Sequence, residues 1–238
     1  MGRAFEEIDF CETALGELVL RRREIPMLDN QEVFEILLNG EFLMSSLFHV
    51  VEEALADLGL AVAPPGDLDV VVGGLGLGYT ATAALRHERV RSVLVVDFLK
   101  PVIEWHRQGT VPLGAALSAD PRTRFVEADF FALAGNPDIS FDEESPGRKF
   151  HAILLDIDHT PSHWLNARHG EFYTVEGLKK LRTHLVPSGV FAMWSDGAPD
   201  GPFCSVLEKA FDEVEARTVS FPNPIREENS SSTVYVAR

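Results

Sequence analysis

Apolar positions in the first 45 residues follow the period of β-strands. Residues 16–21 alternate between apolar and polar, and residues 33–38 form an apolar run of strand length. Asn39-Gly40 follows this run and predicts a tight hairpin, because both central positions of such a turn need a positive φ. The pattern therefore predicts a small β-rich piece at the start of the chain.

The spacing of apolar residues becomes helical after this hairpin. Apolar residues recur at helical spacing over residues 47–58, with Ser45 or Ser46 placed to cap the helix and Gly59 placed to end it. Pro64-Pro65-Gly66 then marks a boundary between two parts of the chain.

Strand and helix patterns alternate over the rest of the chain. Apolar runs predict strands at residues 69–72, 92–96, 124–127, 151–155 and 190–194. Helices are predicted at 79–86, from Pro101, at 174–185 and at 203–214, with a closing hairpin at 218–221 and 233–236. Near-continuous apolar strands separated by helices are typical of a mostly parallel sheet with helices on both faces. We therefore expect an α/β fold, with an N-terminal hairpin and helix piece (1–65) and a Rossmann-like domain (66–238).

The composition is that of a folded globular protein. The chain has 238 residues, of which 45% are hydrophobic and 24% charged, which excludes global disorder. No apolar stretch approaches the ~20 residues that span a bilayer, and the first ten residues contain no apolar signal core. Two cysteines cannot build a disulfide framework. These features predict a cytoplasmic protein with no membrane partner.

The formal net charge of −16 narrows the possible partners. It repels a phosphate backbone, so no nucleic-acid partner is expected, and it attracts a cationic substrate. An acidic surface can also serve solubility alone, and this alternative stays open. Six carboxylates and no Lys or Arg lie between Glu127 and Gly147.

Candidate functional residues follow the predicted strands, because ligands of such a sheet bind beyond the carboxyl ends of its strands. These residues are Gly73 to Gly78, Asp97, Asp129, Asp156 with Asp158, and Trp194 to Asp196.

The glycine-rich loop follows the first of these strands and opens a helix. Gly73, Gly74, Gly76 and Gly78 would let the backbone approach a ligand closely. Their spacing does not fit G-x-G-x-x-G, and it suits a nucleoside with an amino-acid-like tail better than a dinucleotide. A tight turn with no ligand is the alternative.

Two aspartates at strand ends could bind a nucleoside. Asp97 lies 19 residues after Gly78, where a carboxylate can accept hydrogen bonds from ribose hydroxyls. Asp129 could accept a hydrogen bond from an adenine amino group. The alternatives are that Asp97 caps the following helix and that Asp129 is a solvated acid.

Asp156 and Asp158 follow the fourth strand, where the reacting atoms are expected. Alternation along an extended segment would place both carboxylates on one side. Such a pair can hold an ammonium group, and one member can act as a base toward an attacking amine. Loop acids on an acidic protein are the alternative.

His159, His163 and His169 lie close to these acids in the sequence, but their spacing matches no known metal motif, so no metal is expected. His159 and Trp164 are candidates to line a substrate pocket.

Several segments together resemble the spermidine synthase (polyamine aminopropyltransferase) family, within the class I S-adenosylmethionine-dependent methyltransferase fold. They are Leu-Asn-Gly-Glu-Phe (38–42), Val-Gly-Gly-Leu-Gly-Leu-Gly (72–78), Val-Val-Asp-Phe-Leu-Lys-Pro-Val-Ile-Glu (95–104), Glu-Ala-Asp (127–129), Leu-Leu-Asp-Ile-Asp-His-Thr-Pro (154–161), Phe-Tyr-Thr-Val-Glu-Gly-Leu (172–178) and Leu-Val-Pro-Ser-Gly-Val-Phe (185–191).

This resemblance implies a role for each strand-end acid. Asp97 matches the ribose-binding acid of the family and Asp129 the acid on the adenine side. Asp156 and Asp158 match the acidic pair that positions and deprotonates the acceptor amine. The chain departs from the family at Gly76, where the glycine loop usually carries an Asp, and at Met44-Ser45-Ser46, where Tyr-His-Glu is usual.

The resemblance implies an enzyme that moves an aminopropyl group from decarboxylated S-adenosylmethionine to a polyamine or other cationic amine. A homodimer is expected. The alternative is an S-adenosylmethionine-dependent methyltransferase that acts on a small molecule, and a catalytically inactive nucleoside sensor is a third possibility.

Overall fold

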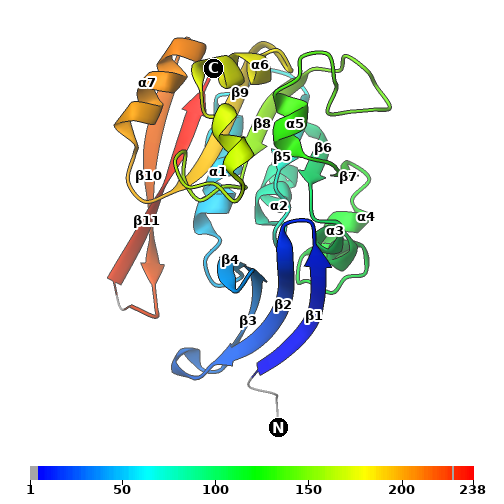
Figure 1. Cartoon of the computed structure of the whole chain (residues 1–238), viewed down its shortest axis with the longest axis vertical. Helices are drawn as coiled ribbons and strands as arrows, with labels where there is room; N and C mark the ends of the chain where they lie inside the picture. Colours follow the sequence, from blue (N-terminus) through cyan, green and yellow to red (C-terminus); the bar gives the residue numbers. More distant parts are fainter. Residues whose placement is uncertain (1–4, 227) are drawn as a thin grey trace.

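A small antiparallel sheet and a larger, mostly parallel one make up this computed structural model, which describes residues 5–226 and 228–238 (Figure 1). The small sheet has the order β1-β2-β3-β4. Its strands are β1 (Phe5–Thr13), β2 (Gly16–Ile25), β3 (Gln31–Leu38) and β4 (Glu41–Ser45), with a short 3-10 helix, η1 (Pro26–Leu28). Asn39 and Gly40 have φ values of 53° and 78°, which confirms the predicted hairpin turn between β3 and β4.

The large sheet has the order β10-β11-β9-β8-β5-β6-β7. Its strands are β5 (Leu68–Gly73), β6 (Val90–Asp97), β7 (Thr123–Glu127), β8 (Phe150–Leu155), β9 (Leu185–Asp196), β10 (Val214–Asn223) and β11 (Glu228–Ala237). The five strands from β7 to β9 are parallel, and the hairpin of β10 and β11 adds to β9 in the antiparallel sense. This confirms the predicted α/β architecture.

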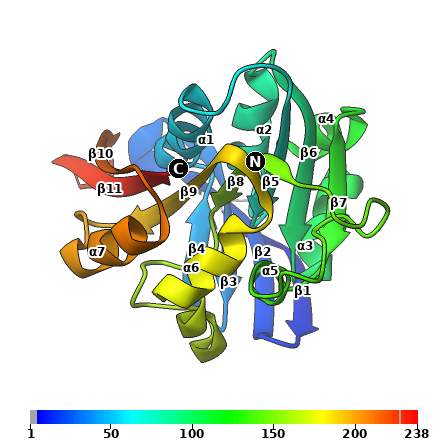
Figure 2. The same cartoon turned by 90° about the horizontal axis from the view of Figure 1, so that it is seen from above.

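Helices cover both faces of the large sheet (Figure 2). One face carries α1 (Val50–Ala61), α2 (Tyr79–Arg86), α3 (Lys100–Arg107) and α4 (Gly114–Ala119). The other carries α5 (Phe130–Ala134), α6 (Val175–Arg182) and α7 (Gly201–Ala210), and the 3-10 helix η2 (Ala167–Glu171) precedes α6.

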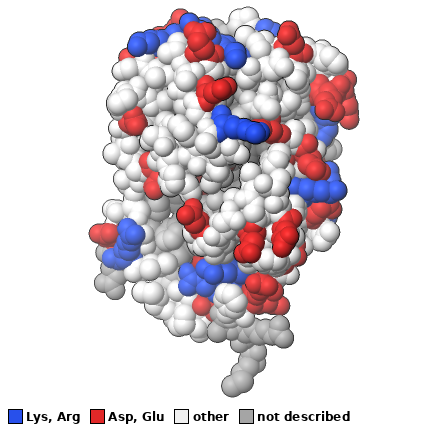
Figure 3. Space-filling model, viewed as in Figure 1, with Lys and Arg blue, Asp and Glu red and all other residues white. Residues whose placement is uncertain are grey.

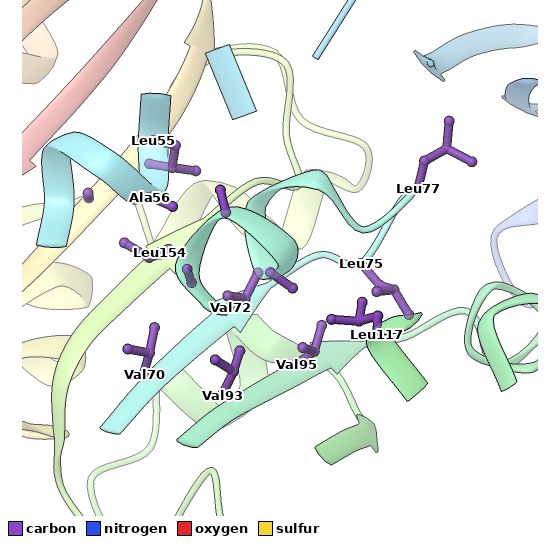
Figure 4. Packing of buried hydrophobic residues seen from close by; sticks show 14 of the residues in the cluster. Leu55, Ala56, Val70, Val72, Leu75, Leu77, Val93, Val95, Leu117 and Leu154 are labelled. Carbon is purple, nitrogen blue, oxygen red and sulfur yellow. The ribbon is translucent and has the colours of Figure 1, made fainter. Parts of the chain in front are cut away.

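Successive residues of the central strands enter opposite cores. Val70 and Val72 pack in the cluster with α1 and α2 (Figure 4), whereas Val71 packs in the cluster with α5, α6 and α7. A strand that is buried on both faces reads as a continuous apolar run, which explains why these strands could be predicted from the sequence.

Helix α1 differs from its predicted bounds at both ends. It begins at Val50, because the Ser46 hydroxyl accepts a hydrogen bond from the Phe34 amide at 2.9 Å instead of capping a helix. It continues through Gly59, where a Cβ atom would lie 2.8 Å from Leu154 Cδ2. Glycine at this position therefore allows close packing on β8, and it does not mark the helix end.

This packing also ties α1 to the large sheet, whose β8 supplies Leu154 and whose β9 supplies Ala192. The division into residues 1–65 and 66–238 stays a prediction. The helix nonetheless shares its core with the second part of the chain.

The small sheet shares an apolar core with the rest of the chain, and two hydrogen bonds add to this contact. The Trp105 indole of α3 donates a hydrogen bond to Asp9 Oδ2 of β1 at 2.6 Å. The Leu77 amide, in the glycine loop, donates to Met44 Sδ of β4 at 2.9 Å. These contacts hold the small sheet beside the carboxyl end of β5.

Within the described residues, no helix is long and apolar enough to cross a membrane.

Candidate active site

A cavity of about 670 Å³ lies between the small sheet and the carboxyl ends of β5, β6 and β8. The order of the large sheet reverses between β5 and β8, and such a switch point is where open α/β sheets bind ligands. The lining includes Ala14, Leu15, Ile36, Leu43, Met44, Glu52, Gly74, Gly76, Asp97, Phe98, Asp129, Phe131, Asp156, Ile157, His159, Leu165, Asn166, Arg168, His169 and Trp194.

The glycine loop forms one wall of the cavity. Gly74 has a φ of +92°, and a Cβ atom there would lie 2.0 Å from the Asp156 carbonyl oxygen. Gly74 and Gly76 line the cavity, whereas Gly73 and Gly78 are not among its lining residues. Gly73 instead gives room to the Phe130 ring of α5, which a Cβ atom would meet at 2.5 Å.

Asp97 joins the glycine loop to the turn after β6. Its carboxylate accepts hydrogen bonds from the amides of Leu75, at 2.8 Å, and Leu99, at 2.7 Å. Burial of the carboxylate raises its pKa to about 6, although these amides oppose the shift. Asp97 thus fixes the loop backbone and also lines the cavity.

Asp129 lies at the N-terminus of α5. Its Oδ1 accepts hydrogen bonds from the amides of Phe131, at 2.9 Å, and Ala132, at 3.1 Å, so it caps this helix. The residue is exposed and lines the cavity.

Asp156 shares its end of the cavity with Glu52 of α1. Burial raises the pKa of Asp156 to about 6. Burial and the negative charge of Asp156 raise the pKa of Glu52 to about 8. The hydroxyl of Thr80 donates a hydrogen bond to Asp156 Oδ2 at 2.9 Å and lies 3.3 Å from the Glu52 carbonyl oxygen. Two mutually repelling carboxylates therefore face one cavity.

Asp158 points away from this cavity. Its side chain is fully buried and accepts hydrogen bonds from the Leu165 amide at 2.7 Å, from His169 Nδ1 at 2.9 Å and from the Tyr173 hydroxyl at 2.9 Å. The pairing of Asp156 and Asp158 on one side is therefore not found, because the chain after β8 does not continue as an extended strand.

His169 connects Asp158 to the cavity. Its ring stacks on Phe131 with centroids 3.8 Å apart, and both residues line the cavity. The ring nitrogen Nδ1 forms the hydrogen bond to Asp158. The other ring nitrogen, Nε2, takes no part in this bond.

Of the aromatic candidates, His159 lines the cavity but Trp164 does not. Trp164 donates a hydrogen bond to the Pro161 carbonyl at 2.8 Å and stacks on Tyr173. Trp194, at the end of β9, lines the cavity instead. Among the described residues, no group of three or more His, Cys, Asp or Glu side chains is arranged to hold a metal ion. That the protein needs no metal stays a prediction.

Gly76 and Met44, where the sequence departs from the family pattern, lie against each other. A Cβ atom on Gly76 would lie 2.5 Å from Met44 Sδ, and Gly76 has a φ of +48°. A larger residue at position 76 would therefore require the Met44 side chain to move, so these two positions are structurally coupled.

Comparison with known proteins places this arrangement among known folds. No protein-family model matches the chain. A polyamine aminopropyltransferase from Pyrobaculum calidifontis is 27% identical over 172 residues, which cover 71% of this chain and 55% of that relative. The match therefore spans about half the length of the curated relative.

Two solved structures share the fold over 97% of the chain. One is the spermidine synthase from Thermotoga maritima, with a TM-score of 0.70 and 18% identity, of which 71% is covered. The other is a spermidine synthase in complex with the transition state analogue AdoDATO, with a TM-score of 0.70 and 20% identity, of which 73% is covered. The chain has a spermidine synthase fold. Its two-sheet architecture matches these structures over nearly the whole chain.

The raised pKa of Glu52 predicts how stability depends on pH. A carboxyl whose pKa is higher in the folded state than in the unfolded state lowers stability wherever the unfolded chain has already lost the proton that the folded chain still holds. From about pH 5 to 8 the free energy of unfolding should therefore fall by roughly 1 kcal/mol per pH unit, and the fall should level off above pH 8, where folded Glu52 ionises too. Urea unfolding of the ligand-free protein at several pH values measures this fall. Glu52→Gln should flatten the profile, and equal slopes for the two proteins would contradict the assignment.

Proposed function

We propose that this protein transfers an aminopropyl group from decarboxylated S-adenosylmethionine to a polyamine or another cationic amine. The observation that carries the proposal is one cavity in which a glycine loop and Asp97 lie beside two carboxylates, those of Asp156 and Glu52. The first pair of features suits a nucleoside, and the carboxylates suit an ammonium group. The curated relative is named for this reaction.

The nucleoside half of the donor would lie along the ends of β5, β6 and β7. Gly74 and Gly76 let the donor approach the loop backbone, and Asp97 would accept hydrogen bonds from the ribose hydroxyls. Asp129 uses Oδ1 to cap α5, so Oδ2 would accept the hydrogen bond from the adenine amino group.

The proposed reaction is a displacement at carbon. The nitrogen of the neutral acceptor amine attacks the aminopropyl carbon next to the sulfonium, and the C–S bond breaks. The bonding electrons pass to sulfur, which leaves as the neutral thioether of 5′-methylthioadenosine. The acceptor nitrogen loses one proton in the process. The chain contributes alignment of the two reactants and a group that takes this proton.

The distribution of charge supports a cationic acceptor. The cavity is lined by Glu52, Asp97, Asp129 and Asp156, and Arg168 is its one Lys or Arg among the described residues. Figure 3 shows acidic and basic side chains intermingled on one face, so the attraction would come from the cavity and the net charge together. A homodimer, a cytoplasmic location and the absence of nucleic-acid and membrane partners stay predictions.

Arg168 favours a second candidate function. S-adenosylmethionine keeps the carboxylate that its decarboxylated form lacks, and that carboxylate needs a cation. Arg168 lines the cavity and makes no ion pair with any described residue. Methyl transfer from S-adenosylmethionine to a small molecule is therefore the alternative.

Mass spectrometry of the products separates the two reactions. We expect the protein, given a mixed pool of amines and decarboxylated S-adenosylmethionine, to add one aminopropyl group to an amine. Given S-adenosylmethionine, it should add no methyl group. A methylated product in the second reaction and no product in the first would contradict the proposal and support the alternative.

Asp97→Ala should weaken binding of 5′-methylthioadenosine by about 1.5–3 kcal/mol, the range for hydrogen bonds to a charged group. Calorimetry measures the affinity. Glu104→Ala is the matched control, because Glu104 lies on the adjacent helix α3 and forms an exposed ion pair with Arg107. Urea unfolding of both variants shows whether the glycine loop survives the change. Unchanged affinity in Asp97→Ala would remove the ribose assignment.

Asp158 is proposed to take part in proton transfer through His169, because its own carboxylate does not line the cavity. It is thus a positioning residue that keeps the proton on Nδ1 and leaves Nε2 to accept one. His169→Gln and Asp158→Asn should each lower turnover by about two to four orders of magnitude, the range for losing a general base.

The pH profile of turnover separates this role from a structural one. Asp158→Asn should change the shape of the profile, because the carboxylate that fixes His169 Nδ1 is lost. Tyr173→Phe serves for comparison, because it removes another donor to the same carboxylate but keeps the contact with His169. Equal losses in both variants with an unmoved profile would show that Asp158 only supports the fold.

A further inference from the structure

The carboxyl group of Glu52 bears on which donor the cavity binds. Helix α1 brings this side chain to the cavity from outside the strand ends, which supply the other candidates. It lies close enough to Asp156 for the two charges to interact, and it lines the same cavity as Gly76, which takes the place of the loop acid usual in the resembled family. Gly76 carries no carboxylate, and Met44 Sδ lies 2.5 Å from where a Cβ atom at position 76 would be, so Met44 would have to move to admit one.

No cation of the described chain compensates these two acids. Neither Glu52 nor Asp156 forms an ion pair with any Lys, Arg or His side chain in the described residues. The neighbouring Glu53 does, since it pairs with Arg86 at 2.6 Å and with His49 at 2.7 Å. Two half-buried carboxylates beside an open cavity therefore lack a cationic partner among the described residues.

Other titratable groups surround Glu52. From α1 itself, the negative charge of Glu53 helps to raise the pKa of Glu52, although Glu53 is paired with Arg86. From α2, Tyr79 faces Glu52, and its ring stacks on His49 with centroids 4.3 Å apart. Asp156 lies at the end of β8, and within the described part of the chain its carboxylate accepts its hydrogen bond from the neutral hydroxyl of Thr80.

We propose that Glu52 acts with Asp156 to bind the primary ammonium of the donor's aminopropyl chain, and that this pair makes the protein select donors without a neighbouring carboxylate. The proposal deepens the proposed function and rests on it. Glu52 supplies from α1 the charge that Gly76 cannot supply from the loop. A donor that keeps its carboxylate would place a third negative charge beside Glu52 and Asp156, which disfavours S-adenosylmethionine.

Calorimetry with three ligands tests the proposal. They are decarboxylated S-adenosylmethionine, S-adenosylmethionine and 5′-methylthioadenosine, which has the nucleoside but no ammonium. Glu52→Gln should weaken binding of the decarboxylated donor by about 10- to 100-fold, because a charged hydrogen-bond partner is lost. It should change the affinity for 5′-methylthioadenosine by less than about twofold. The preference for the decarboxylated donor over S-adenosylmethionine should fall by about tenfold or more.

Glu53→Gln is the matched control. Glu53 is the next residue on the same helix, it carries the same charge, and it does not line the cavity. This variant should keep the wild-type preference between the two donors. A similar loss of preference in both variants would show a general effect of charge and overturn the assignment to Glu52.

A measurement on the wild-type protein avoids dependence on the variant's folding. A pair of acids that holds a proton in the empty cavity should release it when an ammonium binds. At pH 7, calorimetry in two buffers of different ionisation enthalpy should show release of about one proton with decarboxylated S-adenosylmethionine and none with 5′-methylthioadenosine. Equal proton release with both ligands would overturn the proposal.

The proposed function and the role of Glu52 are contradicted by different results. If 5′-methylthioadenosine does not bind the wild-type protein, the proposed function fails. If it binds, and Glu52→Gln keeps the wild-type preference for the decarboxylated donor, only the role of Glu52 fails.

Discussion

The close approach of the Gly74 backbone to the end of β8 is the contact on which the site depends. The Gly74 amide donates a hydrogen bond to the Val96 carbonyl at 2.9 Å, and the Asp156 amide donates to the Gly73 carbonyl at 2.8 Å. The ends of β5, β6 and β8 are thus tied together at one point. A side chain on Gly74 would meet the Asp156 carbonyl at 2.0 Å, so any other residue would separate the glycine loop from the acid that faces it.

The small sheet completes the site because this loop is also its docking surface. Met44 Sδ accepts a hydrogen bond from the Leu77 amide and lies beside Gly76. The same sheet places Leu15 and Ile36 in the cavity wall. A change at Gly76 is therefore coupled to β4, because Gly76 and Met44, two of the positions at which the chain departs from the family pattern, are in contact.

The sequence predicts those elements whose local pattern of residues is typical of one structure. The central strands are apolar on both sides, and Asn39-Gly40 has one favoured turn, so both could be predicted. Strand β1 could not be predicted, because its mixture of acidic and aromatic residues shows no continuous apolar run. The start of α1 was misplaced because Ser46 bonds to β3, a partner far from it in the sequence.

The acids of the site also differ in whether the sequence could predict their position. Asp97, Asp129 and Asp156 follow strands, and the topology of a parallel sheet brings them to one edge, so their position could be predicted. Glu52 and Glu53 look alike as adjacent acids on an amphipathic helix. Only the packing of α1 on β8 turns one toward the cavity and the other toward Arg86. A buried acid without a protein cation opposes folding, and an ammonium ligand removes that cost. Stability of the fold and recognition of the substrate are therefore linked through one side chain that no sequence motif marks.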